Sequence, residues 1–175
     1  LGAVPTAMPI LARFAAQLQA RHPGIVPVAL SMSSQALEAG LENISLDLAL
    51  GYTERMPGRG GPLRAWPQYV EHYFLLRRAS RPPKGLPRGL QIGPPMAWAD
   101  AAALPLCLLT PEMHNRSLVD GAFRAAGAMV RPAMETDSVL TLALSVVAGQ
   151  VCSVLPGALV DAVRGHEGLE ALPLT

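Results

Sequence analysis

The chain has few charged residues, few aromatic residues and two cysteines. Only 15% of its 175 residues are Asp, Glu, Lys or Arg, and 5% are aromatic. The 14 basic and 13 acidic residues give a formal net charge of +1. The chain therefore lacks the excess of Lys and Arg with which nucleic-acid-binding modules hold phosphates. Half of the residues are hydrophobic, which excludes an extended disordered chain and favours a globular fold.

The cysteines and histidines follow no metal-binding pattern. Cys107 and Cys152 each stand alone in an apolar segment, and His22, His72 and His166 are scattered along the chain. No Cys-x-x-Cys pair or disulfide framework is present, so we expect no metal, no cofactor and a reducing compartment.

Motifs of common enzymes are absent as well. The sequence contains no Gly-x-Ser-x-Gly elbow, no phosphate-binding loop ending in Gly-Lys-Ser/Thr, no dinucleotide glycine fingerprint and no His-Glu-x-x-His. We therefore expect a protein that is not an enzyme.

Two segments bear on location. Residues 1–9 have no basic start and contain two prolines, so they do not read as a secretory leader. The charge-free run of residues 138–160 is long enough to raise the question of a membrane span. Because it contains Gln150 and Pro156, a buried helix, a turn at Gly149 and a strand explain it better. We expect no membrane contact and a cytoplasmic location.

Apolar spacing predicts alternating strands and helices in the first part of the chain. A helix over residues 7–21 has Thr6 as its predicted N-cap and Pro9 in its first turn. A buried strand at 25–30, a helix opened by Ser33 and Ser34, and a strand at 46–50 follow. The apolar face of the second helix comprises Leu37, Leu41 and Ile44. This alternation builds a parallel sheet with helices on its faces.

The same alternation resumes near Tyr69. The predicted strands are 70–77, 106–109, 130–134, 151–155 and a last one at 172–174, and the predicted helices are 98–104, 115–126 and 137–148. We therefore predict an α/β fold with two lobes: residues 1–69 form lobe I, residues 70–155 form lobe II, and residues 156–175 return to lobe I. Residues 52–67 and 78–95 are predicted loops, and the second has no functional explanation.

Hydroxyl side chains stand where predicted strands end and helices begin. These junctions are residues 5–6, 31–34, 110–116 and 136–138. Ligands of open α/β sheets bind beyond the carboxyl ends of the strands, and free N–H groups at helix starts favour an anion. Since Ser, Thr and Asp are also ordinary helix caps, a structural role explains each junction better when it is taken alone, whereas the four junctions together favour a ligand cleft. Arg116 can likewise pair with Asp120 on one helix face.

The order of these segments resembles the effector-binding domain of LysR-type transcriptional regulators. The first matching segments are Gly-Ala-Val-Pro-Thr at residues 2–6 and His-Pro-Gly at residues 22–24, and further matches continue to the end of the chain. The other matching segments are residues 33–35, 46–50, 98–100, 104–106, 116–127, 135–138, 147–149 and 154–156.

The resemblance implies a fold, a function and partners. Two Rossmann-like lobes, each with a mostly parallel sheet, would form a type 2 periplasmic-binding-protein-like fold with a small anionic or carboxylate effector between them. Head-to-tail homodimers would use residues 7–21 and 115–126, and the full regulator would be a tetramer that binds DNA through an N-terminal winged helix-turn-helix outside this chain. The positions implied for effector contact are Thr6, Ser33, Ser34, Thr110, His114, Asn115, Thr136 and Asp137.

Two departures from the family pattern lie together at the predicted crossover. Gln150 replaces a common apolar residue, and Val151 stands where the family usually has a second glycine. The alternative readings are an extracytoplasmic solute-binding protein of the same fold and an enzyme built on this scaffold.

Overall fold

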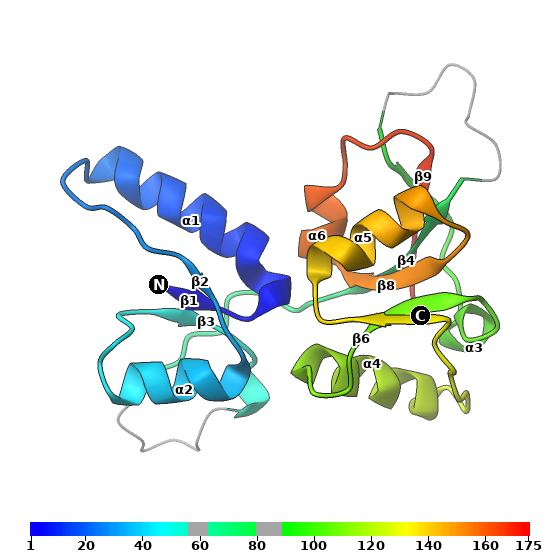
Figure 1. The fold of residues 1–175 in the computed structure, drawn as a ribbon, viewed down its shortest axis with the longest axis horizontal. Helices are drawn as coiled ribbons and strands as arrows, with labels where there is room; N and C mark the ends of the chain where they lie inside the picture. The colour runs from blue at the N-terminus through cyan, green and yellow to red at the C-terminus, as the bar shows by residue number, and fades with distance from the viewer. Residues whose placement is uncertain (56–62, 80–88) are drawn as a thin grey trace. The chain divides into compact units, whose positions relative to one another are not determined.

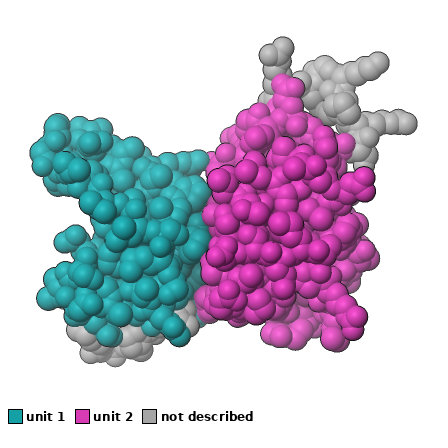
Figure 2. All heavy atoms as spheres, in the orientation of Figure 1, with its two compact units in different colours: residues 1–70 teal, residues 71–175 magenta. Residues whose placement is uncertain are grey.

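The computed structural model describes residues 1–55, 63–79 and 89–175. The chain divides into two compact units, Leu1–Val70 and Glu71–Thr175, which Figure 2 shows in separate colours. This division lies one residue from the predicted boundary between the lobes. The predicted loops at 52–67 and 78–95 lie partly outside the described residues.

Unit 1 is a three-stranded parallel sheet with two helices (Figure 1). The strand order is β2-β1-β3, with β1 at Gly2–Ala3, β2 at Leu30–Ser31 and β3 at Ala49–Leu50. A 3-10 turn, η1 (Pro5–Ala7), leads into α1 (Met8–Arg21), and α2 (Ser34–Glu42) connects β2 to β3. A second 3-10 turn, η2 (Thr53–Arg55), follows β3. The helices lie on opposite sides of the sheet, so the predicted parallel α/β arrangement is confirmed.

The predicted strand at 25–30 is wrong in extent and burial. Only Leu30 and Ser31 pair with β1, while Val26 and Val28 are 82% and 63% exposed. Pro27 has no N–H to donate to a ladder, and β2 is an edge strand, so this apolar segment has no sheet on its outer side. Apolar composition here does not mean burial.

The end of α2 also differs from the prediction. Ile44 was expected on the apolar face, but the helix ends at Glu42 and Ile44 is 85% exposed with a φ of 61°. The strand predicted at 46–50 pairs only at Ala49 and Leu50. Leu46 instead inserts its side chain against Gly2 and Gly40, where an added Cβ would lie 2.9 and 2.8 Å from Leu46 atoms.

Unit 2 is built on a six-stranded mixed sheet of order β5-β9-β4-β8-β6-β7. The strands are β4 (Tyr73–Arg78), β5 (Gln91–Ile92), β6 (Leu106–Leu109), β7 (Met134–Thr136), β8 (Cys152–Pro156) and β9 (Leu169–Pro173). The helices are α3 (Trp98–Ala101), α4 (His114–Ala125), α5 (Val139–Ala148) and α6 (Gly157–Ala162). Neither β5 nor α6 was predicted.

Both faces of this sheet are covered (Figure 1). On one face Leu142 and Val146 of α5 pack with α6, and on the other Val119 and Phe123 of α4 pack with α3. The four residues of β6 are all buried, because this central strand lies between the two layers. Within the described residues, no helix is both long enough and apolar enough to cross a membrane.

Residues 156–175 differ from the predicted return to lobe I. Strand β9 pairs antiparallel with β4 and parallel with β5, and the whole segment belongs to unit 2. Leu169, Ala171 and Leu172 of β9 are buried on the two faces of the sheet. A strand that is apolar on both faces belongs inside a covered sheet, which explains its place beside β4.

Candidate functional site

The carboxyl ends of the three strands of unit 1 form one edge. Backbone hydrogen bonds from Met32 N–H to the Ala3 carbonyl and from Val4 N–H to the Leu50 carbonyl, 2.9 and 3.0 Å long, align these ends. At this edge the Oγ1 of Thr6 and the phenolic oxygen of Tyr52 lie 2.9 Å apart, and either can be the donor. Thr6 is only 2% exposed, so its hydroxyl is satisfied inside the protein.

Thr6 does not cap α1. The N-cap position is Ala7, which makes no side-chain cap bond, while Pro9 lies in the first turn as predicted. The prediction of a Thr6 cap is therefore wrong, because the threonine hydroxyl bonds to Tyr52 instead.

The two serines before α2 have different surroundings. Ser33 is the N-cap, and its Oγ accepts a 3.2 Å hydrogen bond from Ala36 N–H. The Oγ of Ser34 is buried and has no hydrogen-bond partner. A buried hydroxyl without a partner is costly, so of the two serines it is Ser34 whose hydroxyl has unused hydrogen-bonding capacity.

The carboxyl ends of β6 and β7 form the corresponding edge of unit 2. Leu109 is in register with Thr136, and the N–H of Thr110 donates a 3.0 Å hydrogen bond to the Thr136 carbonyl. The Thr136 hydroxyl accepts from Ser138 N–H at 3.1 Å, and Ser138 caps α5. The Oγ1 of Thr110 is buried with no partner of hydrogen-bond geometry.

The remaining predicted residues lie beside this edge. His114 and Asn115 are the first two residues of α4, which therefore begins one residue before the predicted helix of residues 115–126. Asn115 is 5% exposed and donates a 2.8 Å hydrogen bond from Nδ2 to the hydroxyl of Tyr73. Asp137 is exposed. The structure thus joins Thr110 to Thr136 directly and places His114, Asn115 and Asp137 at the starts of the adjoining helices.

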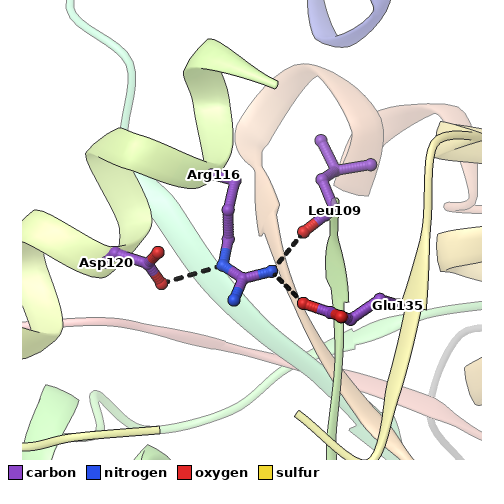
Figure 3. A network of polar contacts seen from close by, with 4 residues as sticks. All are labelled: Leu109, Arg116, Asp120 and Glu135. Atoms are coloured by element: carbon purple, nitrogen blue, oxygen red, sulfur yellow. Dashed lines mark hydrogen bonds and ion pairs between the residues drawn. The ribbon is translucent and has the colours of Figure 1, made fainter. Parts of the chain in front are cut away.

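Arg116 is held by three partners (Figure 3). Its Nε donates to Asp120 Oδ1 at 2.9 Å, and its Nη1 donates to Glu135 Oε1 at 2.7 Å and to the Leu109 carbonyl. Burial opposes its charge, but the hydrogen bonds to Glu135 and Asp120 outweigh that cost, so the pKa of Arg116 is raised. The predicted pairing of Arg116 with Asp120 is confirmed.

The ionisable groups near the unit 2 edge are Glu112, on the loop before α4, and the two cysteines. The pKa of the exposed Glu112 is lowered, first by its own backbone N–H and then by the nearby Thr110 hydroxyl, although the distance and angle between them do not meet hydrogen-bond geometry. Burial raises the pKa of Cys107 and of Cys152, so neither is a ready thiolate. No group of three or more His, Cys, Asp or Glu among the described residues is arranged to hold a metal ion.

Comparison with known protein families decides which family this is. The family described as LysR substrate binding domain matches residues 1–175. The chain belongs to this family. The resemblance to LysR-type regulators noted in the sequence is therefore confirmed. Comparison with curated protein sequences gave no match.

Several solved structures share the fold of this LysR domain. A cysteine mutant of OxyR from Corynebacterium glutamicum is 20% identical with a TM-score of 0.73, and the match covers 99% of this chain and 52% of that one. The CcmR regulatory domain from Synechocystis, in complex with 2-PG, is 16% identical with a TM-score of 0.76 over 99% and 78% of the two chains. The reduced OxyR regulatory domain from Pseudomonas aeruginosa is 21% identical with a TM-score of 0.70 over 99% and 80%.

These likenesses confirm the predicted type 2 periplasmic-binding-protein-like fold of the LysR domain. The chain spans about half the length of the OxyR mutant that it matches.

Sequence reasoning missed Tyr52 and Tyr73, whose hydroxyls bond to Thr6 and Asn115. Tyr52 could have been predicted from the sequence, because it follows the end of β3 in the same way that the junction residues follow the ends of the other strands. Tyr73 lies at the start of β4, and no local pattern points to its contact with α4.

Proposed function

We propose that this LysR domain senses a small anion or carboxylate and passes the signal to a DNA-binding transcriptional regulator of which it is a part. The residues proposed for effector contact are Thr6, Ser33 and Ser34 in unit 1, and Thr110, His114, Asn115, Thr136 and Asp137 in unit 2. Tyr52 joins this set through its hydrogen bond to Thr6.

The observation that carries this proposal is a pair of buried hydroxyls. Ser34 Oγ and Thr110 Oγ1, one in each unit, have no hydrogen-bond partner among the described residues. Leaving such a group unpaired costs about 1–3 kcal/mol, and a bound ligand with suitable oxygens removes that cost. Both hydroxyls lie in residues that the sequence singled out for effector contact.

The chemistry of the contacts supports an anionic effector. Ser34 is the first residue of α2, and Thr110 lies four residues before the first residue of α4. Both hydroxyls are therefore close in sequence to the backbone N–H groups of a helix start. Such groups stabilise negative charge without a buried cation. The related CcmR domain was solved with 2-PG, which makes 2-PG a reasonable first probe.

The assembly proposed for the regulator is a head-to-tail homodimer through α1 and α4, with a tetramer for the full protein. On α1, Phe14 is 39% exposed and only Leu11 is buried, which leaves most of this helix available. DNA contact is proposed for a winged helix-turn-helix outside this chain, acting in the cytoplasm. Family membership favours this function over the extracytoplasmic solute-binding alternative and over an enzyme.

Calorimetric titration of the domain with 2-PG, small carboxylates and inorganic phosphate tests the proposal. For a probe that binds, we expect S34A and T110A each to weaken affinity about fivefold, because each variant removes one hydrogen bond. Ser117→Ala, at an exposed position of α4, is the matched control and should leave affinity unchanged. Equal affinities in all three variants would remove both hydroxyls from the site.

A further inference from the structure

A polar cluster of unit 2 is centred on Arg116 and includes the carboxyl ends of β6 and β7. The Arg116 side chain is 9% exposed and contacts three separate segments: Asp120 on its own helix, the Leu109 carbonyl at the end of β6, and Glu135 on β7 (Figure 3). A buried guanidinium with three acceptors differs from a surface ion pair, because the three hydrogen bonds fix its position.

The contacts of Arg116 reach the residues next to both threonines. Leu109 directly precedes Thr110, and Glu135 directly precedes Thr136. A hydrogen bond from the Thr110 N–H to the Thr136 carbonyl joins the ends of β6 and β7 directly. Arg116, Leu109, Thr110, Thr136 and Glu135 therefore form a closed ring of covalent and hydrogen-bonded connections.

We propose that Arg116 is a positioning residue for effector binding, because its Nη1 group fixes the ends of β6 and β7 and thereby holds the hydroxyls of Thr110 and Thr136 in place. This inference rests on the proposed function for its binding consequence. The Nη1 contacts with Leu109 and Glu135 position the edge, whereas the Nε contact with Asp120 tethers Arg116 to α4.

Three variants separate these contacts. R116M removes all three hydrogen bonds while keeping much of the aliphatic side chain. R116K keeps a charged donor that can serve Leu109 and Glu135, and D120N removes only the anion on α4. The control is R77M, which breaks the 2.9 Å Arg77–Glu170 ion pair between β4 and β9 of the same unit, away from the β6–β7 edge.

The first readout is the backbone order of Thr110 and Thr136, measured by NMR relaxation without ligand. We expect order parameters of about 0.85 in the wild type, R116K, D120N and R77M, and below about 0.6 in R116M. Unfolding midpoints measured in parallel show which variants share the same stability loss. Order parameters that stay high in R116M, or that fall equally in R77M, overturn the proposal.

The second readout is the affinity of whichever of 2-PG or inorganic phosphate binds the wild-type domain. We expect a loss of about tenfold in R116M, because charge-assisted hydrogen bonds no longer hold the edge, and nearly full recovery in R116K. An unchanged affinity in R116M overturns the proposal even if its stability falls. Failure of every probe to bind the wild type counts against the proposed function instead, and the order parameters still decide the role of Arg116.

Discussion

The backbone N–H of Thr110 donates a 3.0 Å hydrogen bond to the carbonyl of Thr136, so two hydroxyl-bearing residues 26 positions apart end adjacent strands together. Their side chains then differ: the Thr136 hydroxyl accepts from Ser138 N–H, while that of Thr110 is buried and unpaired. One threonine therefore completes a turn before α5, and the other keeps bonding capacity for a ligand. The same division holds for Ser33 and Ser34 in unit 1.

The serine pair gives a direct test of this division. S33A removes the N-cap bond to Ala36 and should cost about 1 kcal/mol of stability. S34A removes a buried hydroxyl that has no partner, so we expect no loss of stability and a gain of up to about 1–3 kcal/mol. Urea denaturation measures both, and a larger loss in S34A than in S33A would contradict the assignment.

The hydroxyl pair of unit 1 is expected to couple energetically. T6V and Y52F each break the 2.9 Å contact and should each lower the free energy of unfolding by about 1 kcal/mol. Since both remove the same bond, the double variant should cost less than the sum of the two. Strict additivity in the double-mutant cycle would show that the contact contributes nothing.

Packing around Leu46 predicts opposite effects for two glycines in helices. A Cβ on Gly40 would lie 2.8 Å from the buried Leu46 side chain, which also packs on Gly2, so G40A should cost about 1–3 kcal/mol. Gly121 in α4 has nothing within 4 Å of the same position, so G121A should gain about 0.5–1 kcal/mol. Thermal unfolding compares the two, and stabilisation by G40A would refute this packing.

Glu71 should make stability depend on pH near neutrality. Burial raises the pKa of its carboxyl from 4.5 to about 7, so the folded protein binds a proton that the unfolded chain has released. Its contribution is fully present below pH 4.5 and is lost as pH rises toward 7. E71Q should flatten this part of the stability profile.

Glu112 provides the control of opposite sign for that measurement. Its pKa is lowered, so its contribution is present above the unfolded pKa and is lost as pH falls. E112Q should leave the profile between pH 4.5 and 7 as it is in the wild type. A wild-type profile that is flat over this range, or one that E71Q does not change, would contradict the burial of Glu71 as the cause.

The sequence was sufficient for α1, α2, α4, α5 and the central strands because their signals are local. Pro9 in the first turn of α1, Ser33 and Ser138 as caps, and the apolar run of β6 all act within a few residues. Parallel strand–helix alternation in unit 1 then follows from short connections.

The errors lie where distant segments decide the outcome. The apolar segment around Val26 and Val28 is exposed because no strand lies beyond β2, and β9 joins unit 2 because β4 and β5 provide its neighbours. At the site, hydroxyl residues at junctions were predictable, but which hydroxyls are already satisfied was not. Thr6 is bonded to Tyr52, 46 positions away, and this cannot be read from spacing.

The most direct measurement of the account is an NMR titration of the labelled domain with 2-PG and inorganic phosphate, following the amide signals of Ser34 and Thr110 together. We expect a binding probe to shift both signals with one common dissociation constant, because Ser34 and Thr110 are both proposed effector contacts. Saturable shifts confined to one unit, or lying away from Thr6, Ser34, Thr110 and Thr136, would contradict it.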